Sequence, residues 1–116
     1  KILQPVRIGK MIQPHREIHH ECGEFRGLWR MLSHGCQMFK NLFEELDLKL
    51  EKHSSFQNAT QWQMAYITDI FQEMIDRNRV INISLVEKGW AELDTRQDYE
   101  RLLDMVETQR LSSLMN

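Results

Sequence analysis

The residues best suited to chemistry lie in segment 89–100, whose sequence is GWAELDTRQDYE. Asp94 is expected where an extended stretch ends and a helix begins, because Thr95 and Asp98 have the spacing of a helix capping box. A carboxylate in that position faces a ligand crevice and can hold a hard cation such as Mg²⁺, which takes oxygen ligands from carboxylates and substrate phosphates. The alternative is that Asp94 is a loop acid that stabilises the helix N-terminus electrostatically.

A second group of possible metal ligands combines imidazoles with a thiol. Its members are His15, His19, His20 and Cys22. Such ligands suit Zn²⁺, and a structural zinc site is therefore a rival hypothesis for this segment. Pro14 and Gly23 predict a loop here, and neither a Cys-x-x-Cys pair nor a helix-borne His-x-x-x-His pair supports the site. Cys36 is expected to be a buried thiol on an amphipathic helix.

Hydrophobic periodicity predicts the elements that must position these residues. Two amphipathic helices are expected at 36–50 and at about 64–77, and the capping box predicts a third after Thr95. Ser33 is expected to cap the first helix and Asn78 to stop the second. The third is expected to bury four residues, Tyr99, Leu102, Leu103 and Val106. Extended segments are predicted at 6–10, 25–32, 80–86 and 90–94.

This order of elements predicts a mixed α/β fold with a partly parallel sheet, whose ligand sites lie beyond the carboxyl ends of its strands. The 116 residues fit one domain. A net charge of −2 without a basic face gives no support to nucleic-acid binding. No apolar run approaches the roughly 20 residues of a membrane helix, and no signal-peptide pattern opens the chain. We therefore expect a cytoplasmic protein with reduced thiols and no membrane partner.

Segment 90–100 resembles the closing motif of a nucleotidyltransferase family. That family includes choline-phosphate cytidylyltransferases, sugar-nucleotide enzymes and the nucleotidyltransferase domains joined to phosphoenolpyruvate phosphomutases. Three other segments are similar to family motifs in the same order: VRIGK at 6–10, GEFRGL at 23–28 and TDIFQEMID at 68–76. The resemblance covers about residues 6–105.

The resemblance implies that the chain is one partial domain, residues 1–116, forming the acceptor- and metal-binding half of such an enzyme. The implied fold is the C-terminal half of a nucleotide-diphospho-sugar transferase-like, Rossmann-like three-layer fold with a mixed sheet. The implied reaction is attack of a phosphate monoester or phosphonate on the α-phosphorus of a nucleoside triphosphate, with CTP expected, and release of pyrophosphate. Mg²⁺ is the implied cofactor.

The resemblance also assigns roles to individual residues. Asp94 corresponds to a ligand of the catalytic Mg²⁺, and Lys10 to a lysine that contacts the acceptor's phosphate. Glu24 corresponds to a residue of the acceptor pocket, while Trp90 and Glu92 flank the metal ligand. Each has a simpler reading: Lys10 as a solvated lysine, Glu24 as an ion-pair partner of a nearby arginine, and Trp90 as core packing.

The sequence departs from the family pattern in two respects. It contains neither the glycine-rich loop that binds the triphosphate nor the first metal-binding aspartate. The first residue is Lys1 rather than Met, so a fragment or a processed chain is expected. We therefore expect the isolated chain to be inactive, and either to oligomerise or to depend on a missing N-terminal half. A non-catalytic assembly or regulatory module derived from the same fold is the alternative.

Overall fold

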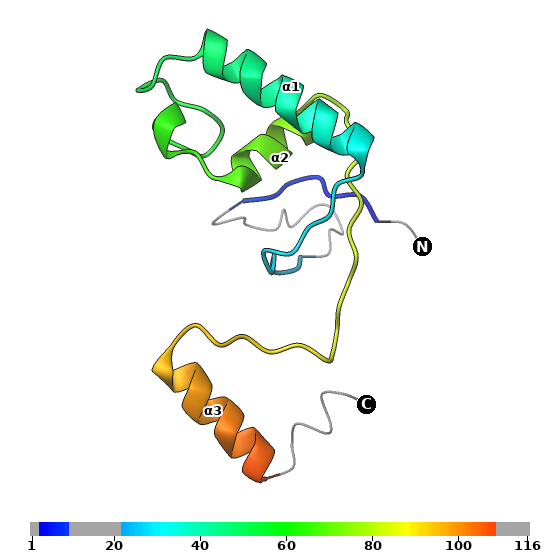
Figure 1. Ribbon diagram of the computed structural model, residues 1–116, viewed down its shortest axis with the longest axis vertical. Coiled ribbons are helices and arrows are strands. Elements are labelled where there is room, and N and C mark those ends of the chain that lie inside the picture. The colour runs from blue at the N-terminus through cyan, green and yellow to red at the C-terminus, as the bar shows by residue number, and fades with distance from the viewer. Residues whose placement is uncertain (1–2, 10–21, 109–116) are drawn as a thin grey trace, which may run out of the picture. The chain divides into compact units, whose positions relative to one another are not determined.

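The computed structural model describes residues 3–9 and 22–108, whose regular structure is helical (Figure 1). The helices are α1 (Ser33–Lys49), the short 3-10 helix η1 (Trp62–Met64), α2 (Ile67–Asp76) and α3 (Arg96–Glu107). By its contacts the chain divides into unit 1, residues 1–83, and unit 2, residues 84–116. Unit 1 therefore contains α1, η1 and α2, and unit 2 contains α3. None of the helices described is long and apolar enough to span a membrane.

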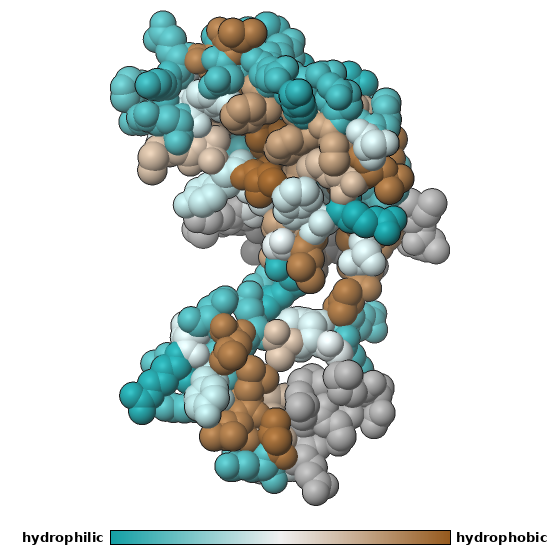
Figure 2. Space-filling view, in the orientation of Figure 1, coloured by the Kyte–Doolittle hydropathy of each residue, from teal (hydrophilic) through white to brown (hydrophobic). Residues whose placement is uncertain are grey.

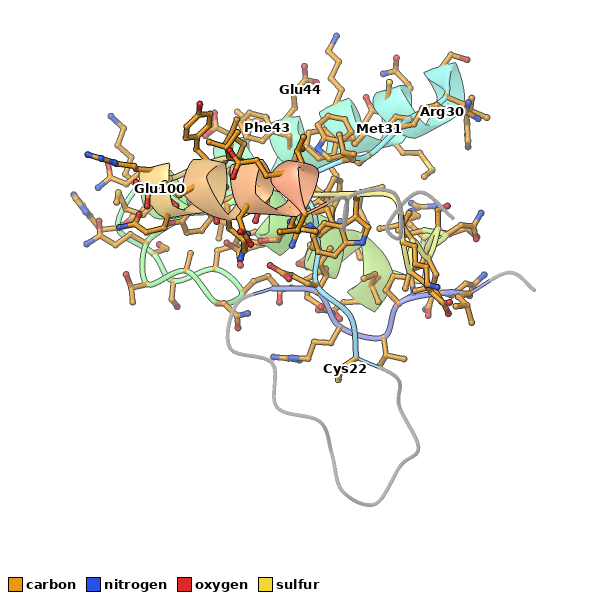
Figure 3. All side chains as sticks on the ribbon, turned by 90° about the horizontal axis from the view of Figure 1, so that it is seen from below. Cys22, Arg30, Met31, Phe43, Glu44 and Glu100 are labelled. Atoms are coloured by element: carbon orange, nitrogen blue, oxygen red, sulfur yellow. The ribbon has the colours of Figure 1, made fainter. Side chains whose placement is uncertain are left out.

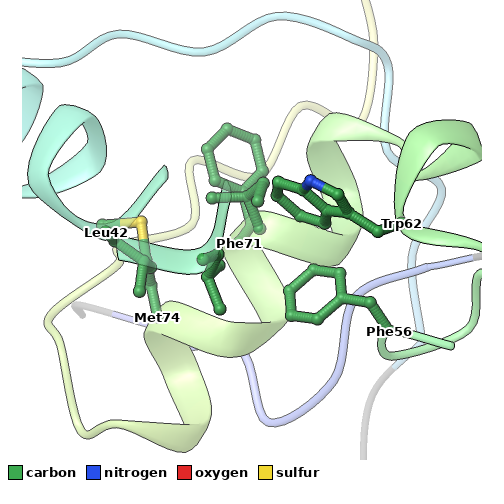
Figure 4. Packing of buried hydrophobic residues seen from close by; sticks show 7 residues of the cluster. Leu42, Phe56, Trp62, Phe71 and Met74 are labelled. Carbon is green, nitrogen blue, oxygen red and sulfur yellow. The ribbon is translucent and has the colours of Figure 1, made fainter. Parts of the chain in front are cut away.

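The core of unit 1 forms where the apolar faces of α1 and α2 meet (Figure 4). Phe71 of α2 lies near its centre, and the rings of Phe25, Trp29 and Phe39 approach it edge-on at centroid distances of 6.4, 5.9 and 6.0 Å. Such edge-to-face contacts stabilise aromatic clusters beyond the area that they bury. The buried members of this core are Leu42, Leu46, Phe56, Trp62, Ile70, Phe71 and Met74.

Local side-chain chemistry explains where α2 begins and ends. Asp69 accepts a hydrogen bond from the Tyr66 backbone N–H at 2.8 Å, so the helix starts at Ile67 rather than near residue 64. At the other end Asn78 adopts a left-handed conformation with φ of 60°. The amide of Arg79 then donates to the carbonyl of Met74 at 2.9 Å. These features form a Schellman motif, which confirms Asn78 as the predicted helix stop.

The first helix was located correctly, but its predicted cap is wrong. Ser33 is the first residue of α1, and the N-cap position belongs to Leu32, which makes no side-chain cap hydrogen bond. Leu42 and Leu46 are buried as the periodicity predicted. Cys36 is exposed, which contradicts its predicted burial, and none of residues 33–36 packs against the core.

The predicted α/β fold is wrong: across residues 3–9 and 22–108 the structure forms no strand and no sheet. The extended segments exist, but a strand requires a neighbouring backbone that accepts and donates its hydrogen bonds. Of the predicted strands, segment 80–86 makes a single antiparallel bridge, between Ile83 and Leu3. In the first predicted strand, the backbone of Ile8 bonds to the side chain of Gln72 instead.

Unit 2 is built around a helix with little cover. None of the residues of α3 is buried, which contradicts the predicted buried face. Tyr99, Leu103 and Val106 are 56, 44 and 53% exposed, and Figure 2 shows hydrophobic side chains at the surface of this unit. Local capping therefore defines α3, since burial within the described part of unit 2 contributes little.

Candidate functional site

The backbone around Asp94 is held by the capping box of α3, which the structure confirms. Asp98 donates its backbone N–H to Thr95 Oγ1 at 3.1 Å, and Thr95 donates its own N–H to Asp98 Oδ2 at 3.1 Å. The same oxygen also accepts the N–H of Asp94 at 3.2 Å. The Asp98 carboxylate therefore holds the backbone N–H groups of both Thr95, the N-cap, and Asp94, the residue before it.

Both carboxylate oxygens of Asp98 already accept hydrogen bonds from the protein. Its Oδ1 accepts a hydrogen bond from Arg101 at 3.0 Å. The hydrogen bond from the Asp94 backbone is the largest cause that lowers the pKa of Asp98, followed by the bond from the Thr95 side chain. Both effects favour the charged carboxylate, as does its place at the positive end of α3. Asp98 thus acts as an anchor for Asp94 rather than as a second free ligand.

The side chain of Asp94 has no such partner. It is exposed and makes no hydrogen bond or ion pair with residues 3–9 or 22–108. An ionised carboxylate that is free of protein donors, on a backbone that is fixed, suits one oxygen ligand of Mg²⁺. No group of three or more potential ligand side chains gathers in the part of the chain that the structure covers. Asp94 therefore fits one corner of a metal site and not a complete one.

Trp90 and Glu92 lie on the extended segment that leads to Asp94. Gly89, with φ of 82°, makes the left-handed turn that precedes this segment. Trp90 is 42% exposed, so its interpretation as core packing is wrong. Glu92 is exposed as well. The structure thus brings Trp90, Glu92 and Asp94 together along one accessible stretch of unit 2.

The other predicted site residues belong to unit 1. Glu24 pairs with Arg26 at 2.8 Å, and its side chain is 73% exposed, in agreement with the simpler reading of this residue. Lys10 lies outside the described residues, as do the three histidines of the zinc hypothesis, His15, His19 and His20. Cys22, labelled in Figure 3, is a free exposed thiol.

A polar clamp on α2, formed by Asp69 and Gln72, was missed by the sequence reasoning. Both residues are buried, at 4 and 3% exposure. Gln72 Oε1 accepts the N–H of Ile8 at 2.8 Å, and its Nε2 donates to the Val6 carbonyl at 3.4 Å and to Asp76 Oδ1 at 2.8 Å. One amide side chain thereby pairs with the backbone as a neighbouring strand would, which explains how the segment is held without a sheet.

Asp69 anchors a second loop against the same segment. Its Oδ1 accepts the backbone N–H of Asn58 at 3.2 Å. Asn58 lies against Gly9, where a Cβ would come within 2.7 Å of Asn58 Nδ2. Gly9 also has a φ of 151°, which side chains rarely adopt. The two buried polar residues of α2 therefore both support residues 6–9, Gln72 directly and Asp69 through Asn58.

A sequence signal for this clamp does exist. Asp69, Gln72 and Asp76 are three and four residues apart, which places them in one polar stripe beside the apolar face of α2. All three belong to the TDIFQEMID segment that carries the family resemblance. Their burial could not be read from spacing, because a polar stripe at a helix edge is usually solvated.

Comparison of the chain with protein-family models, with curated proteins and with solved structures gives no match in any of the three. The candidate residues therefore rest on the geometry within each unit: in unit 2 an exposed carboxylate just before a capped helix, and in unit 1 a clamped segment at residues 6–9.

Proposed function

We propose that this chain is the acceptor- and metal-binding part of a Mg²⁺-dependent nucleotidyltransferase. The reaction transfers a nucleoside monophosphate, from CTP as the expected donor, to a phosphorylated small alcohol, an aminophosphonate or a sugar phosphate. An oxygen of the acceptor's phosphate or phosphonate forms the new bond to the α-phosphorus, and the bond to pyrophosphate breaks. The observation that carries the proposal is the free carboxylate of Asp94, held in place by the capping box of α3.

Phosphoryl and nucleotidyl transfer depend on positioning and charge neutralisation more than on covalent chemistry. Mg²⁺, when bound, neutralises charge on the phosphates and orients them. Asp94 would supply one carboxylate oxygen to it, and the Asp98 bonds to two adjacent amides hold the backbone that carries this side chain. The order of four family-like segments along the chain supports the same assignment.

Lys10 holds the acceptor's phosphate in this proposal, and the polar clamp holds residues 6–9, which precede Lys10 in the sequence. Gln72 orients Ile8, and Asn58 packs against Gly9, immediately before the lysine. Glu24 lines the acceptor pocket, with Arg26 holding its carboxylate. Trp90 and Glu92 form a wall beside Asp94.

The test supplies the glycine-rich nucleotide-binding segment that this sequence does not contain, in the same polypeptide or as a second chain. Pyrophosphate release is measured with CTP first and then with the other common nucleoside triphosphates. Each is paired in turn with phosphocholine, 2-aminoethylphosphonate and glucose 1-phosphate, with and without Mg²⁺. Asp94→Asn is expected to lower kcat about 100-fold or more. The matched control Glu107→Gln removes a carboxylate from the other end of α3 and should leave turnover unchanged.

Two results would overturn the proposal. The first is the absence of pyrophosphate release with every acceptor and every common nucleoside triphosphate. The second is unchanged Mg²⁺-dependent turnover in Asp94→Asn. Absence of turnover together with stable association of the two polypeptides would favour the non-catalytic assembly module.

A further inference from the structure

A pocket of about 410 Å³ lies where α1 faces the end of α2, and its lining includes none of the candidate site residues named above. It is lined by Met38, Asn41, Leu42, Glu45, Met74, Arg77 and Arg79. Its volume falls within the range of small-molecule sites, roughly 300–1,000 Å³. The two methionines and Leu42 supply an apolar wall that can adapt to a ligand's shape.

In this pocket the polar groups that have no hydrogen-bond partner are mainly N–H donors. Both oxygens of Glu45 already have cationic donors, since Lys49 donates to Oε1 at 2.8 Å and Arg77 to Oε2 at 2.6 Å. Asn41 Oδ1 accepts from Gln37 at 2.8 Å, which leaves the amide N–H groups of Asn41 as the unused part of that side chain.

Arg79 is the charged group that remains free. Its backbone is fixed by the Schellman motif after α2, and its guanidinium meets no acceptor among residues 3–9 and 22–108. A guanidinium presents a planar fork of donors that matches a carboxylate or phosphate. The pocket therefore combines an apolar wall, one unpaired cation and further N–H donors.

We propose that this pocket binds a small amphiphilic anion, a carboxylate or a phosphate monoester joined to a short apolar body. Arg79 and the Asn41 amide hold the anionic oxygens, while Met38, Leu42 and Met74 contact the apolar body. The site shares no residue with the Asp94 segment or the polar clamp. Its test is therefore independent of the proposed nucleotidyl transfer.

The experiment titrates the full chain with octanoate and with octyl phosphate and follows the methyl resonances of Met38 and Met74. Both methyl groups are expected to shift with a saturable dependence, and the tighter of the two probes identifies the head group. Octanol and octylamine, which keep the apolar body without the anion, should bind at least about tenfold more weakly. Inorganic phosphate alone should also bind more weakly, because it lacks the apolar contact.

Two pocket variants, Arg79→Gln and Asn41→Asp, and one control, Arg30→Gln, test where the anion binds. Arg79→Gln is expected to weaken binding about tenfold, the loss of one charge-assisted contact. Arg30→Gln, which removes an equivalent charge outside the pocket, should leave binding unchanged; Figure 3 labels Arg30 next to the start of α1. Asn41→Asp, at an exposed position, places a negative charge in the pocket and should weaken binding by at least the same factor.

Absence of saturable shifts with both anions would overturn this proposal. So would equal binding of octylamine, or unchanged affinity in both Arg79→Gln and Asn41→Asp. If Arg30→Gln weakens binding as much as Arg79→Gln does, the affinity comes from general surface charge, and the site is refuted as well.

Discussion

Replacing Gln72 by leucine tests the polar clamp most directly. Leucine nearly matches glutamine in volume but offers neither donor nor acceptor, so the N–H of Ile8 and the carbonyl of Val6 lose their partner. Asp76 loses one of its donors and keeps the hydrogen bond from Gln57 at 2.9 Å. We expect the backbone at residues 6–8 to detach locally, because no other described group takes these bonds.

The magnitude follows from the geometry of the bonds. The two bonds of 2.8 Å contribute about 1 kcal/mol each, and the weaker contact of 3.4 Å contributes less. Gln72 is only 3% exposed, so water replaces the lost partners only if the segment moves outward. We expect the free energy of unfolding of unit 1 to fall by about 2–3 kcal/mol.

Urea denaturation measures this loss, and amide hydrogen exchange at Ile8 localises it. Gln63→Leu is the matched control, since Gln63 is exposed and also lies in unit 1, and its effect should stay within about 0.5 kcal/mol. If Gln72→Leu unfolds at the same urea concentration as the parent chain and the Ile8 amide keeps its protection, the clamp does not hold this segment.

The remaining predictions concern Gly9 and the end of α3. Gly9→Ala should lower the stability of unit 1 by about 1–3 kcal/mol, because of the φ of Gly9 and because the new Cβ would lie 2.7 Å from Asn58 Nδ2. Adding Asn58→Ala should recover part of this loss in urea denaturation. If it recovers none, the contact with Asn58 does not cause the loss. Thr95→Ala should cost about 1 kcal/mol and lower the helical circular dichroism of α3, whereas Thr95→Ser should retain the cap. Asp98 has a lowered pKa in the folded chain, so the unfolded chain binds the proton more tightly. The stability that the charged Asp98 contributes is therefore present above the ordinary pKa of 3.8 and is lost as the pH falls through the folded pKa. The helical signal of α3 should therefore fall on acidification below about pH 4, and Asp98→Asn should remove that transition; its persistence would assign the transition to another group. Asp94→Asn should leave stability within about 0.5 kcal/mol, since the Asp94 carboxylate has no partner in the described chain.

The helices were predictable because their signals are local. The apolar residues of α1 and α2 recur at helical spacing, and the caps act within a few residues of each helix end. Thr95 with Asp98 and the stop at Asn78 were read correctly for this reason. The start of α2 was missed by about three residues, because its N-cap is Tyr66, a residue type that the usual N-cap preferences do not indicate.

The sheet could not be predicted, since β structure depends on partners that are distant in sequence. Segment 80–86 has the residue types of a strand, but residue type measures fit to a sheet that must already exist. Residues 6–8 find their partner in Gln72, more than 60 positions away, and it is a side chain instead of a strand. No local pattern carries that information.

The candidate site also has features set by neighbouring residues in the sequence and features set by tertiary packing. Asp94 and the box that holds it lie within five residues, so the sequence by itself determined that an aspartate precedes a capped helix. Tertiary structure alone decided that Trp90 is accessible and that Asp69 and Gln72 are buried as a clamp. The physical reason is that capping joins neighbours along the chain, whereas burial and exposure depend on which distant residues pack nearby.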